Sequence, residues 1–144
     1  MTIQEKLIGT SWELEIYQSE DKFGDIIYPL GENATGNIIF TSENRLAVQI
    51  MAENHEENLL EKNLDTFNTE VEKEMAKLGY HAYSGLFDID EEKAHLTTHV
   101  DVSLIPSYVG TDQIRKATIE GDTLYLSNVK HPERKLVWKK LVTR

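Results

Sequence analysis

YPLGENATGNIIFTSENRLAVQIM, residues Tyr28 to Met51, is the stretch that decides the fold of this chain. Its opening Tyr-Pro-Leu-Gly has the composition of a turn. Residues 35–41 are rich in β-forming side chains, Ser-Glu-Asn makes a second turn, and residues 45–51 alternate polar and apolar side chains. That alternation is typical of a strand with one buried face. The stretch therefore predicts a β-hairpin, and it contains no catalytic signature.

The same alternation recurs along most of the chain, with turn-forming residues such as Gly121-Asp122 between the segments. Further strands are expected at 11–17, 25–28, 80–89, 93–104, 111–120, 123–128 and 135–141. Many short strands joined by short turns favour a closed barrel, because closure removes exposed strand edges. We therefore expect a mainly β fold, a single up-and-down antiparallel β-barrel of eight or nine strands, with residues 1–144 as one domain.

Two segments have the pattern of a helix instead. Thr2 and Glu5 form a capping-box pattern ahead of a short helical turn at residues 4–8. Around residues 59–78 the apolar period lengthens to three and four, which predicts an amphipathic helix inserted in the barrel. Asn58 is the expected cap of this helix and Gly79 its end. Its apolar stripe consists of Leu60, Leu64, Phe67, Val71, Met75 and Leu78.

The composition excludes several classes of function. The net charge of −10 argues against binding to nucleic acid and to anionic membrane surfaces. The chain has no cysteine, which excludes a disulfide framework and a thiolate metal site. No apolar run has the length of a membrane span, and residues 1–6 lack the pattern of a secretory signal. We expect a cytoplasmic protein that uses no cofactor.

Four blocks of sequence resemble a known family. They are LIGTSWEL at 7–14, YPLGENATGNIIFT at 28–41, YHAYSGLFDID at 80–90 and THVDVSLIPSYVGTDQIRK at 98–116, with LVWKKL at 136–141 fitting the closing strand. In this order they resemble the lipocalin-like domain family of bacteria and fungi, which belongs to the calycin barrels. The resemblance implies a small β-barrel with a central cavity. It implies little about activity, since most members of that family are uncharacterised.

Polar residues on two neighbouring strands are candidates for a binding site. His99 and Asp101 point the same way from one strand, and Gln113 and Arg115 share a face of the next. One register places His99 opposite Arg115, and a slip of one residue places them on opposite faces. An inward patch would orient a polar group of a ligand, whereas an outward patch would be ordinary cross-strand pairing. The apolar Val100 and Val102 are expected to face the interior.

The rest of the expected cavity wall is aromatic and apolar. His81, Tyr83 and Phe87 share one face of the strand at 80–89, and Met51 and Trp138 are expected to add apolar wall. The expected ligand contacts are Met51, His81, Tyr83, Phe87, His99, Gln113, Arg115 and Trp138. We expect Trp12 to seal the closed end of the barrel.

Other residues are given structural roles. Tyr108 and Thr111, which flank Gly110, could line the mouth, but we interpret their loop as structural. His95 and His99 stand four residues apart on a strand, about 13 Å, which is too far to hold one metal ion. No metal site is therefore expected.

Three functions fit these patterns. The first is binding of a small, partly apolar molecule in the barrel cavity. The second is a cofactor-independent isomerase or cyclase that uses His99 or His81 in acid–base chemistry. The third is a non-catalytic scaffold that forms a homodimer. We favour the first.

Overall fold

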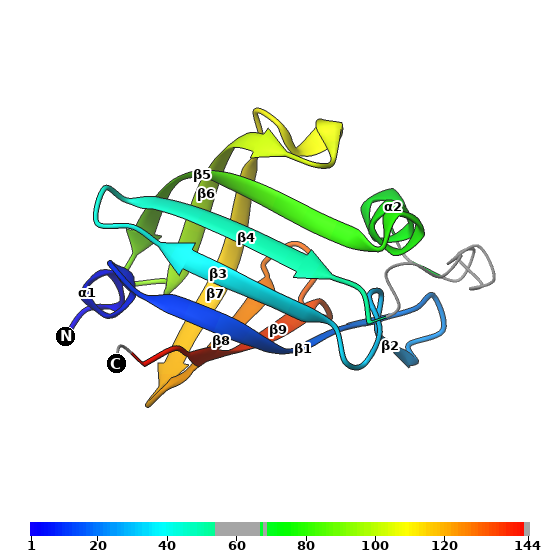
Figure 1. The fold of residues 1–144 in the computed structure, drawn as a ribbon, viewed down its shortest axis with the longest axis horizontal. Coiled ribbons are helices and arrows are strands. Elements are labelled where there is room, and N and C mark those ends of the chain that lie inside the picture. Colours follow the sequence, from blue (N-terminus) through cyan, green and yellow to red (C-terminus); the bar gives the residue numbers. More distant parts are fainter. Residues whose placement is uncertain (54–66, 68, 143–144) are drawn as a thin grey trace.

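The computed structural model describes residues 1–53, 67 and 69–142 and shows an antiparallel β-barrel (Figure 1). Its strands are β1 (Ser11–Glu20), β2 (Ile26–Ile27), β3 (Thr35–Phe40), β4 (Arg45–Met51), β5 (Tyr80–Asp90), β6 (His95–Ser103), β7 (Asp112–Glu120), β8 (Thr123–Asn128) and β9 (Lys135–Lys140). From β3 to β9 each strand pairs with the next, and β1 joins β3 to β9. The predicted mainly β, closed up-and-down barrel is confirmed, with β2 as an extra strand beside β1.

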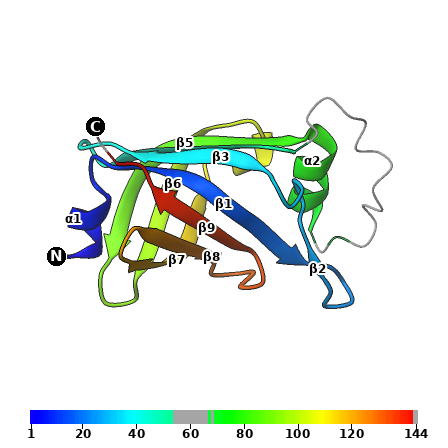
Figure 2. The same cartoon turned by 60° about the horizontal axis from the view of Figure 1, so that its bottom comes forward.

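The two ends of the barrel differ. Helix α1 (Ile3–Leu7) lies at one end, together with the N-terminus and the end of β9 (Figure 2). The predicted capping box is present, since Thr2 accepts a hydrogen bond from the Glu5 amide and the Glu5 carboxylate accepts one from the Thr2 amide. Helix α2 (Glu70–Leu78) and strand β2 lie at the opposite end. We call this opposite end the mouth.

Helix α2 is shorter than the sequence pattern predicts. It begins at Glu70, where Thr69 caps it by accepting a hydrogen bond from the Glu72 amide, and it ends at the predicted Gly79, whose φ is 70°. Phe67 was expected inside the helix, but it pairs with Asp21 in an isolated β-bridge. The side chain of Phe67 is buried although its backbone is extended. The spacing of four residues between Phe67 and Val71 therefore does not require a helix at Phe67. The expected cap Asn58, with Leu60 and Leu64, lies outside the described residues.

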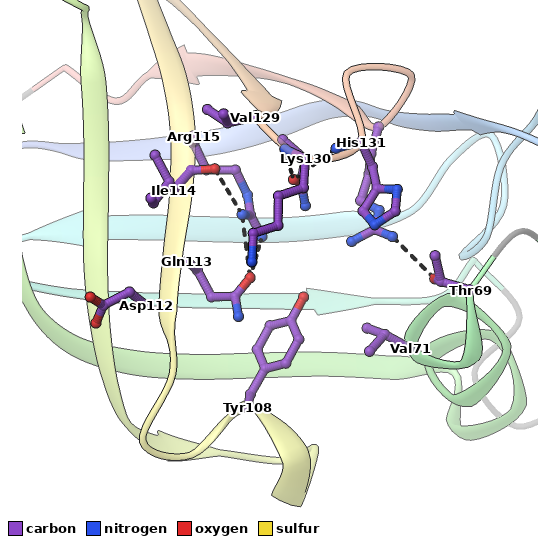
Figure 3. A pocket seen from close by; sticks show the side chains of 12 residues that line it. Thr69, Val71, Tyr108, Asp112, Gln113, Ile114, Arg115, Val129, Lys130 and His131 are labelled. Atoms are coloured by element: carbon purple, nitrogen blue, oxygen red, sulfur yellow. Dashed lines mark hydrogen bonds between the residues drawn. The ribbon is translucent and has the colours of Figure 1, made fainter.

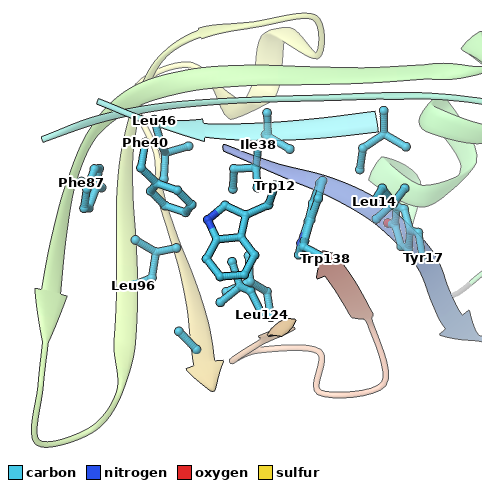
Figure 4. Packing of buried hydrophobic residues seen from close by; sticks show 14 of the residues in the cluster. Trp12, Leu14, Tyr17, Ile38, Phe40, Leu46, Phe87, Leu96, Leu124 and Trp138 are labelled. Atoms are coloured by element: carbon cyan, nitrogen blue, oxygen red, sulfur yellow. The ribbon is translucent and has the colours of Figure 1, made fainter. Parts of the chain in front are cut away.

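The hydrophobic core runs along the barrel interior, from Phe87 and Phe40 to Trp138 and Tyr17 (Figure 4). We call the end that holds Phe87, Phe40 and Trp12 the packed end. Trp12 is 1% exposed, as expected for a side chain that seals the closed end, and its indole N–H donates to the Thr10 hydroxyl at 2.8 Å. Phe40 and Phe87 meet edge to face with ring centroids 5.4 Å apart. Both rings belong to this packed end of the barrel.

A β-bulge in β6 changes which side chains face the core. Gly85 stands opposite Val100 and Ser84 opposite Val102, so Asp101 is an extra residue in the strand. Val100 is buried as predicted, whereas Val102 is 61% exposed, because the bulge reverses the inward and outward alternation. Leu104, beyond the end of the strand, is also exposed. The bulge depends on Gly85, since a Cβ atom there would lie 2.0 Å from the His99 carbonyl oxygen.

The register between β6 and β7 differs from the one that would place His99 opposite Arg115. His99 stands opposite Asp112 and Leu96 opposite Arg115. The side chain of Arg115 therefore lies on the inner face with Leu96, whereas His99 lies on the outer face.

Candidate functional site

The barrel interior contains a small aromatic cavity of about 30 Å³. Three of the rings in its wall contact one another: His81 lies 5.3 Å from both Tyr83 and Tyr108, and those two tyrosines lie 5.6 Å apart between centroids. The full wall comprises Tyr17, Ile38, Val48, Ile50, His81, Tyr83, Tyr108, Arg115, Leu126, Arg134, Leu136 and Trp138. We call this space the inner cavity.

A second pocket, of about 200 Å³, opens at the mouth (Figure 3). It lies between the start of α2, the start of β7 and the loop that joins β8 to β9. Tyr108, Arg115 and Arg134 line both this outer pocket and the inner cavity. These three side chains therefore stand between the solvent-facing pocket and the barrel interior.

Arg115 is held at this boundary by its neighbours on β7. Its guanidinium donates to the Gln113 side-chain oxygen at 3.4 and 3.5 Å and to the Ile114 carbonyl at 3.2 Å. Gln113 in turn donates to the Thr111 hydroxyl at 2.9 Å, and that hydroxyl donates to the Tyr108 carbonyl at 2.6 Å. This chain of hydrogen bonds orients the guanidinium of Arg115. The residue is only 7% exposed.

Arg134 is fixed by an acidic partner on helix α2. Its Nη2 atom donates to Oε1 of Glu72 at 3.0 Å and to the Thr69 hydroxyl at 3.1 Å. The Thr69 contact lies beside the outer pocket in Figure 3. This pair joins the start of the helix to the loop between β8 and β9.

Burial and the charges of the two arginines shift the pKa values of His81 and Tyr83. Burial, together with the smaller effects of the positive charges of Arg115 and Arg134, lowers the pKa of His81 to about 3. Burial raises the pKa of Tyr83, against the opposing effect of Arg115. His81 and Tyr83 are therefore both neutral at neutral pH.

Several buried polar atoms of the site have no hydrogen-bond partner among the described residues. They include the indole Nε1 of Trp138, Nε of Arg134 and Nδ1 of His81. Trp138 is fully buried in the inner cavity wall. A buried donor without an acceptor costs about 1–3 kcal/mol, so these atoms mark places where a bound polar group would be stabilised.

The structure brings together part of the predicted site. His81, Tyr83, Arg115 and Trp138 line the inner cavity, and Gln113 lines the outer pocket beside Arg115. The other three predicted contacts, Met51, Phe87 and His99, line neither space.

Each of these three departures has a simple cause. Met51 is 41% exposed because the alternation of β4 places Ile50, and not Met51, inside. Phe87 shares the inner face of β5 with His81 but lies farther along the strand, in the packed end with Phe40. His99 is on the outer face of β6, where its ring nitrogens contact Asp88 at 2.7 Å and Asp112 at 2.8 Å.

Sequence reasoning missed other residues of the site. Tyr17, Arg134 and Glu72 were not singled out, and the loop of Tyr108 was interpreted as structural, whereas Tyr108 lines both spaces. The sequence contains no signal for Tyr17, because a β-bulge between Leu14 and Ile16 turns this residue inward. Nothing in the sequence pairs Glu72 with Arg134, which lie 62 residues apart.

A closed antiparallel barrel with an aromatic interior and a pocket at one end defines a protein of the lipocalin type. The family model for the lipocalin-like domain matches residues 8–141, so the chain belongs to the lipocalin-like domain family. No curated protein and no solved structure matches the chain. Within the described residues, no helix has the length and apolar character needed to cross a membrane.

Proposed function

We propose that this protein binds a small, partly apolar molecule at the mouth of the barrel. The observation that carries the proposal is the connection between the outer pocket and the inner cavity through Tyr108, Arg115 and Arg134. Lipocalin-like barrels commonly bind small hydrophobic ligands, which supports the same function. The proposed contacts are Tyr83, Tyr108 and Trp138 for the apolar part of the ligand and Gln113 and Arg115 for its polar part.

The two volumes limit the size of the ligand. One water molecule needs about 10–15 Å³ on the same scale, so the inner cavity of about 30 Å³ has room for very few atoms. The outer pocket of about 200 Å³ is below the ~300–1,000 Å³ of most ligand pockets. The ligand is therefore small and occupies the outer pocket, with one apolar end directed toward the aromatic wall.

The hypothesis of an isomerase or cyclase receives less support. A general base works best when its pKa lies near the working pH, whereas burial lowers the pKa of His81 to about 3. His99 has acidic neighbours, but it lies on the outer face of the barrel, away from the inner cavity. We therefore propose binding without catalysis.

The remaining expectations about partners and location stay predictions. They are that the chain acts as one cytoplasmic domain, needs no cofactor or metal, and binds neither nucleic acid nor membranes. The net charge of −10 and the absence of cysteine support them. Formation of a homodimer is likewise a prediction.

Native mass spectrometry of the full chain purified from its own host tests the proposal. We expect a stoichiometric small molecule that is released on denaturation. A variant that narrows the outer pocket, Val71→Trp, should lose it, because Val71 lines that pocket. The matched control is Glu74→Trp, on the exposed side of the same helix.

Protein that carries no molecule, and shows no thermal shift with a broad panel of small metabolites, would overturn the proposal. Equal occupancy of wild type and Val71→Trp would place the ligand elsewhere on the protein.

A further inference from the structure

We propose that the molecule bound at the mouth is an organic acid whose carboxylate pairs with Arg115. This inference rests on the binding function proposed above and names the chemical class of the ligand. It is carried by two independent observations: the charge of Arg115, and the buried N–H of Trp138.

Arg115 is a buried cation without an acidic partner in the described part of the chain. Its side chain is only 7% exposed, and none of the ion pairs found among the described residues includes it. Glu72, the one buried carboxylate among the described residues, is paired with Arg134. Asp112, which lines the outer pocket, directs its carboxylate to His99. The lining of the outer pocket is therefore positive on balance, with Arg115, Lys130 and Arg134 against Asp112, in a protein of net charge −10.

A buried charge is normally compensated by an opposite charge. The hydrogen bonds of Arg115 reach neutral oxygens, those of Gln113 and the Ile114 carbonyl, at 3.2–3.5 Å. These distances are long for bonds from a guanidinium, because charge-assisted N–H···O bonds are usually about 2.7–2.9 Å. The neutral oxygens orient the planar guanidinium of Arg115 but do not neutralise its positive charge. A carboxylate would do both, since its two oxygens match the fork.

The second observation concerns two unmatched donors that belong to residues of the inner cavity wall. The indole N–H of Trp138 is buried in the inner cavity wall and has no acceptor among the described residues. The Nε atom of Arg134, also in that wall, has none either. Tryptophan and arginine side chains can only donate, whereas an ionised carboxylate can only accept. The unmatched donors therefore select an acceptor-rich ligand over an alcohol or an amine.

The surrounding side chains indicate what the rest of the acid resembles. Tyr83, Tyr108 and Trp138 present aromatic faces and edges to the inner cavity. Because the inner cavity of about 30 Å³ has room for very few atoms, the body of the acid occupies the outer pocket of about 200 Å³ beside Tyr108, which favours a monocarboxylic acid with one or two rings. An inorganic anion would leave the aromatic wall without a contact.

Isothermal titration calorimetry of the full chain with two matched probes tests this assignment. The probes are 2-naphthoate and 2-naphthalenemethanol, which share the ring system and differ in the charged group. We expect wild type to bind the acid at least tenfold more tightly than the alcohol. Arg115→Met should abolish this preference by weakening binding of the acid at least tenfold more than binding of the alcohol. Arg115→Lys, which keeps the charge but loses the fork, should retain part of it.

Arg45→Met is the matched control, because Arg45 pairs with Asp101 on the outer surface. It should keep the full preference for the acid. Thermal unfolding of Arg115→Met should show a folded protein, so that a lost preference is not a lost fold.

The outcomes separate this inference from the proposed function. If wild type binds both probes equally, or Arg115→Met keeps the preference, the acid assignment is wrong while a binding cavity stands. If inorganic phosphate at equal concentration displaces 2-naphthoate, the site is a general anion site and the assignment is again overturned. If neither probe binds and the protein from its host is empty, the binding function itself fails.

Discussion

Arg134 and Glu72 form an ion pair in which both partners are buried: Nη2 lies 3.0 Å from Oε1, and the two side chains are 6% and 0% exposed. Glu72 belongs to α2, and Arg134 to the loop between β8 and β9. The pair therefore attaches α2 to the wall of the barrel.

Removing one member of this pair should strongly destabilise the protein. Arg134→Met leaves the Glu72 carboxylate buried without its cation, and a broken buried pair costs about 3–5 kcal/mol. We expect a loss of this size in the free energy of unfolding measured with urea. The double variant Glu72→Met with Arg134→Met should be more stable than Arg134→Met alone, because no charge remains buried.

The control for that experiment is the surface pair of Lys73 and Glu70 on the same helix, 3.1 Å apart, in which Lys73 is half-buried and Glu70 is exposed. Lys73→Met should cost less than about 0.5 kcal/mol, since surface pairs contribute little. Equal losses for Lys73→Met and Arg134→Met would contradict the role given to burial.

Replacing Gly85 should damage the barrel at the β6 bulge. A Cβ atom at Gly85 would lie 2.0 Å from the His99 carbonyl oxygen, and backbone atoms cannot move aside as a side chain can. We expect Gly85→Ala to lower the free energy of unfolding by at least about 2 kcal/mol, as overpacking does. Ser84→Ala, one residue earlier on the same strand, should stay within about 0.5 kcal/mol. Similar stability of the two variants would show that the strands separate without cost.

His81 should make the protein sensitive to mild acid. Its folded pKa of about 3 lies below the ordinary value of 6.5, so the unfolded state gains a proton first as the pH falls. The free energy of unfolding should therefore decrease by about 1.4 kcal/mol per pH unit below pH ~6.5 from this group alone. Urea unfolding at pH 6 and pH 5 should show this slope in wild type and its loss in His81→Phe. An unchanged slope in the variant would mean that His81 is protonated in the folded protein.

His99 should change the free energy of unfolding in the opposite direction to His81, and in a higher pH range. Its hydrogen bond with Asp88, and then that with Asp112, raise the pKa of its ring above 6.5. The stabilisation is complete below the unfolded pKa and is lost as the pH rises through the folded pKa. NMR titration should place the midpoint of His99 above 6.5, and Asp88→Asn should lower it more than Asp112→Asn does. A midpoint at or below 6.5 would show that these contacts do not persist in solution.

The same histidine is a control for the acid experiment. His99→Gln should leave the slope between pH 6 and pH 5 unchanged, because the stabilisation from His99 is constant there. It should instead reduce the loss of stability above pH 6.5.

Local pattern was sufficient for most of the fold. The hairpin at Tyr28–Met51 was predicted because a half-buried strand repeats every two residues, and β4 has the predicted bounds. Gly79 ends α2 as expected, because a glycine readily adopts the positive φ of 70° found there. Such features depend on neighbours in the chain, which the sequence displays directly.

The predictions that failed depended on distant neighbours. The helix was expected to include Phe67, but a partner strand residue, Asp21, holds Phe67 in an extended bridge. Val102 was expected inside, but a bulge opposite Gly85 turned it outward. A pattern within one segment contains no information about which segment lies opposite, or where an extra residue interrupts the pairing.

The candidate site likewise combines features that follow from local pattern with features that depend on distant neighbours. By itself the sequence determined a mainly β barrel with its inner faces, and it placed His81 and Tyr83 on one of them and Gln113 beside Arg115 on another. Only the tertiary structure decided that Arg115 points inward while His99 points outward, because one step of register exchanges the two faces of a strand. Only the closed barrel brings Tyr108 and Arg134 to Arg115, and buries Glu72 against an arginine 62 residues away. Burial and charge pairing are properties of the assembled fold, and they determine which of the polar residues can bind a ligand.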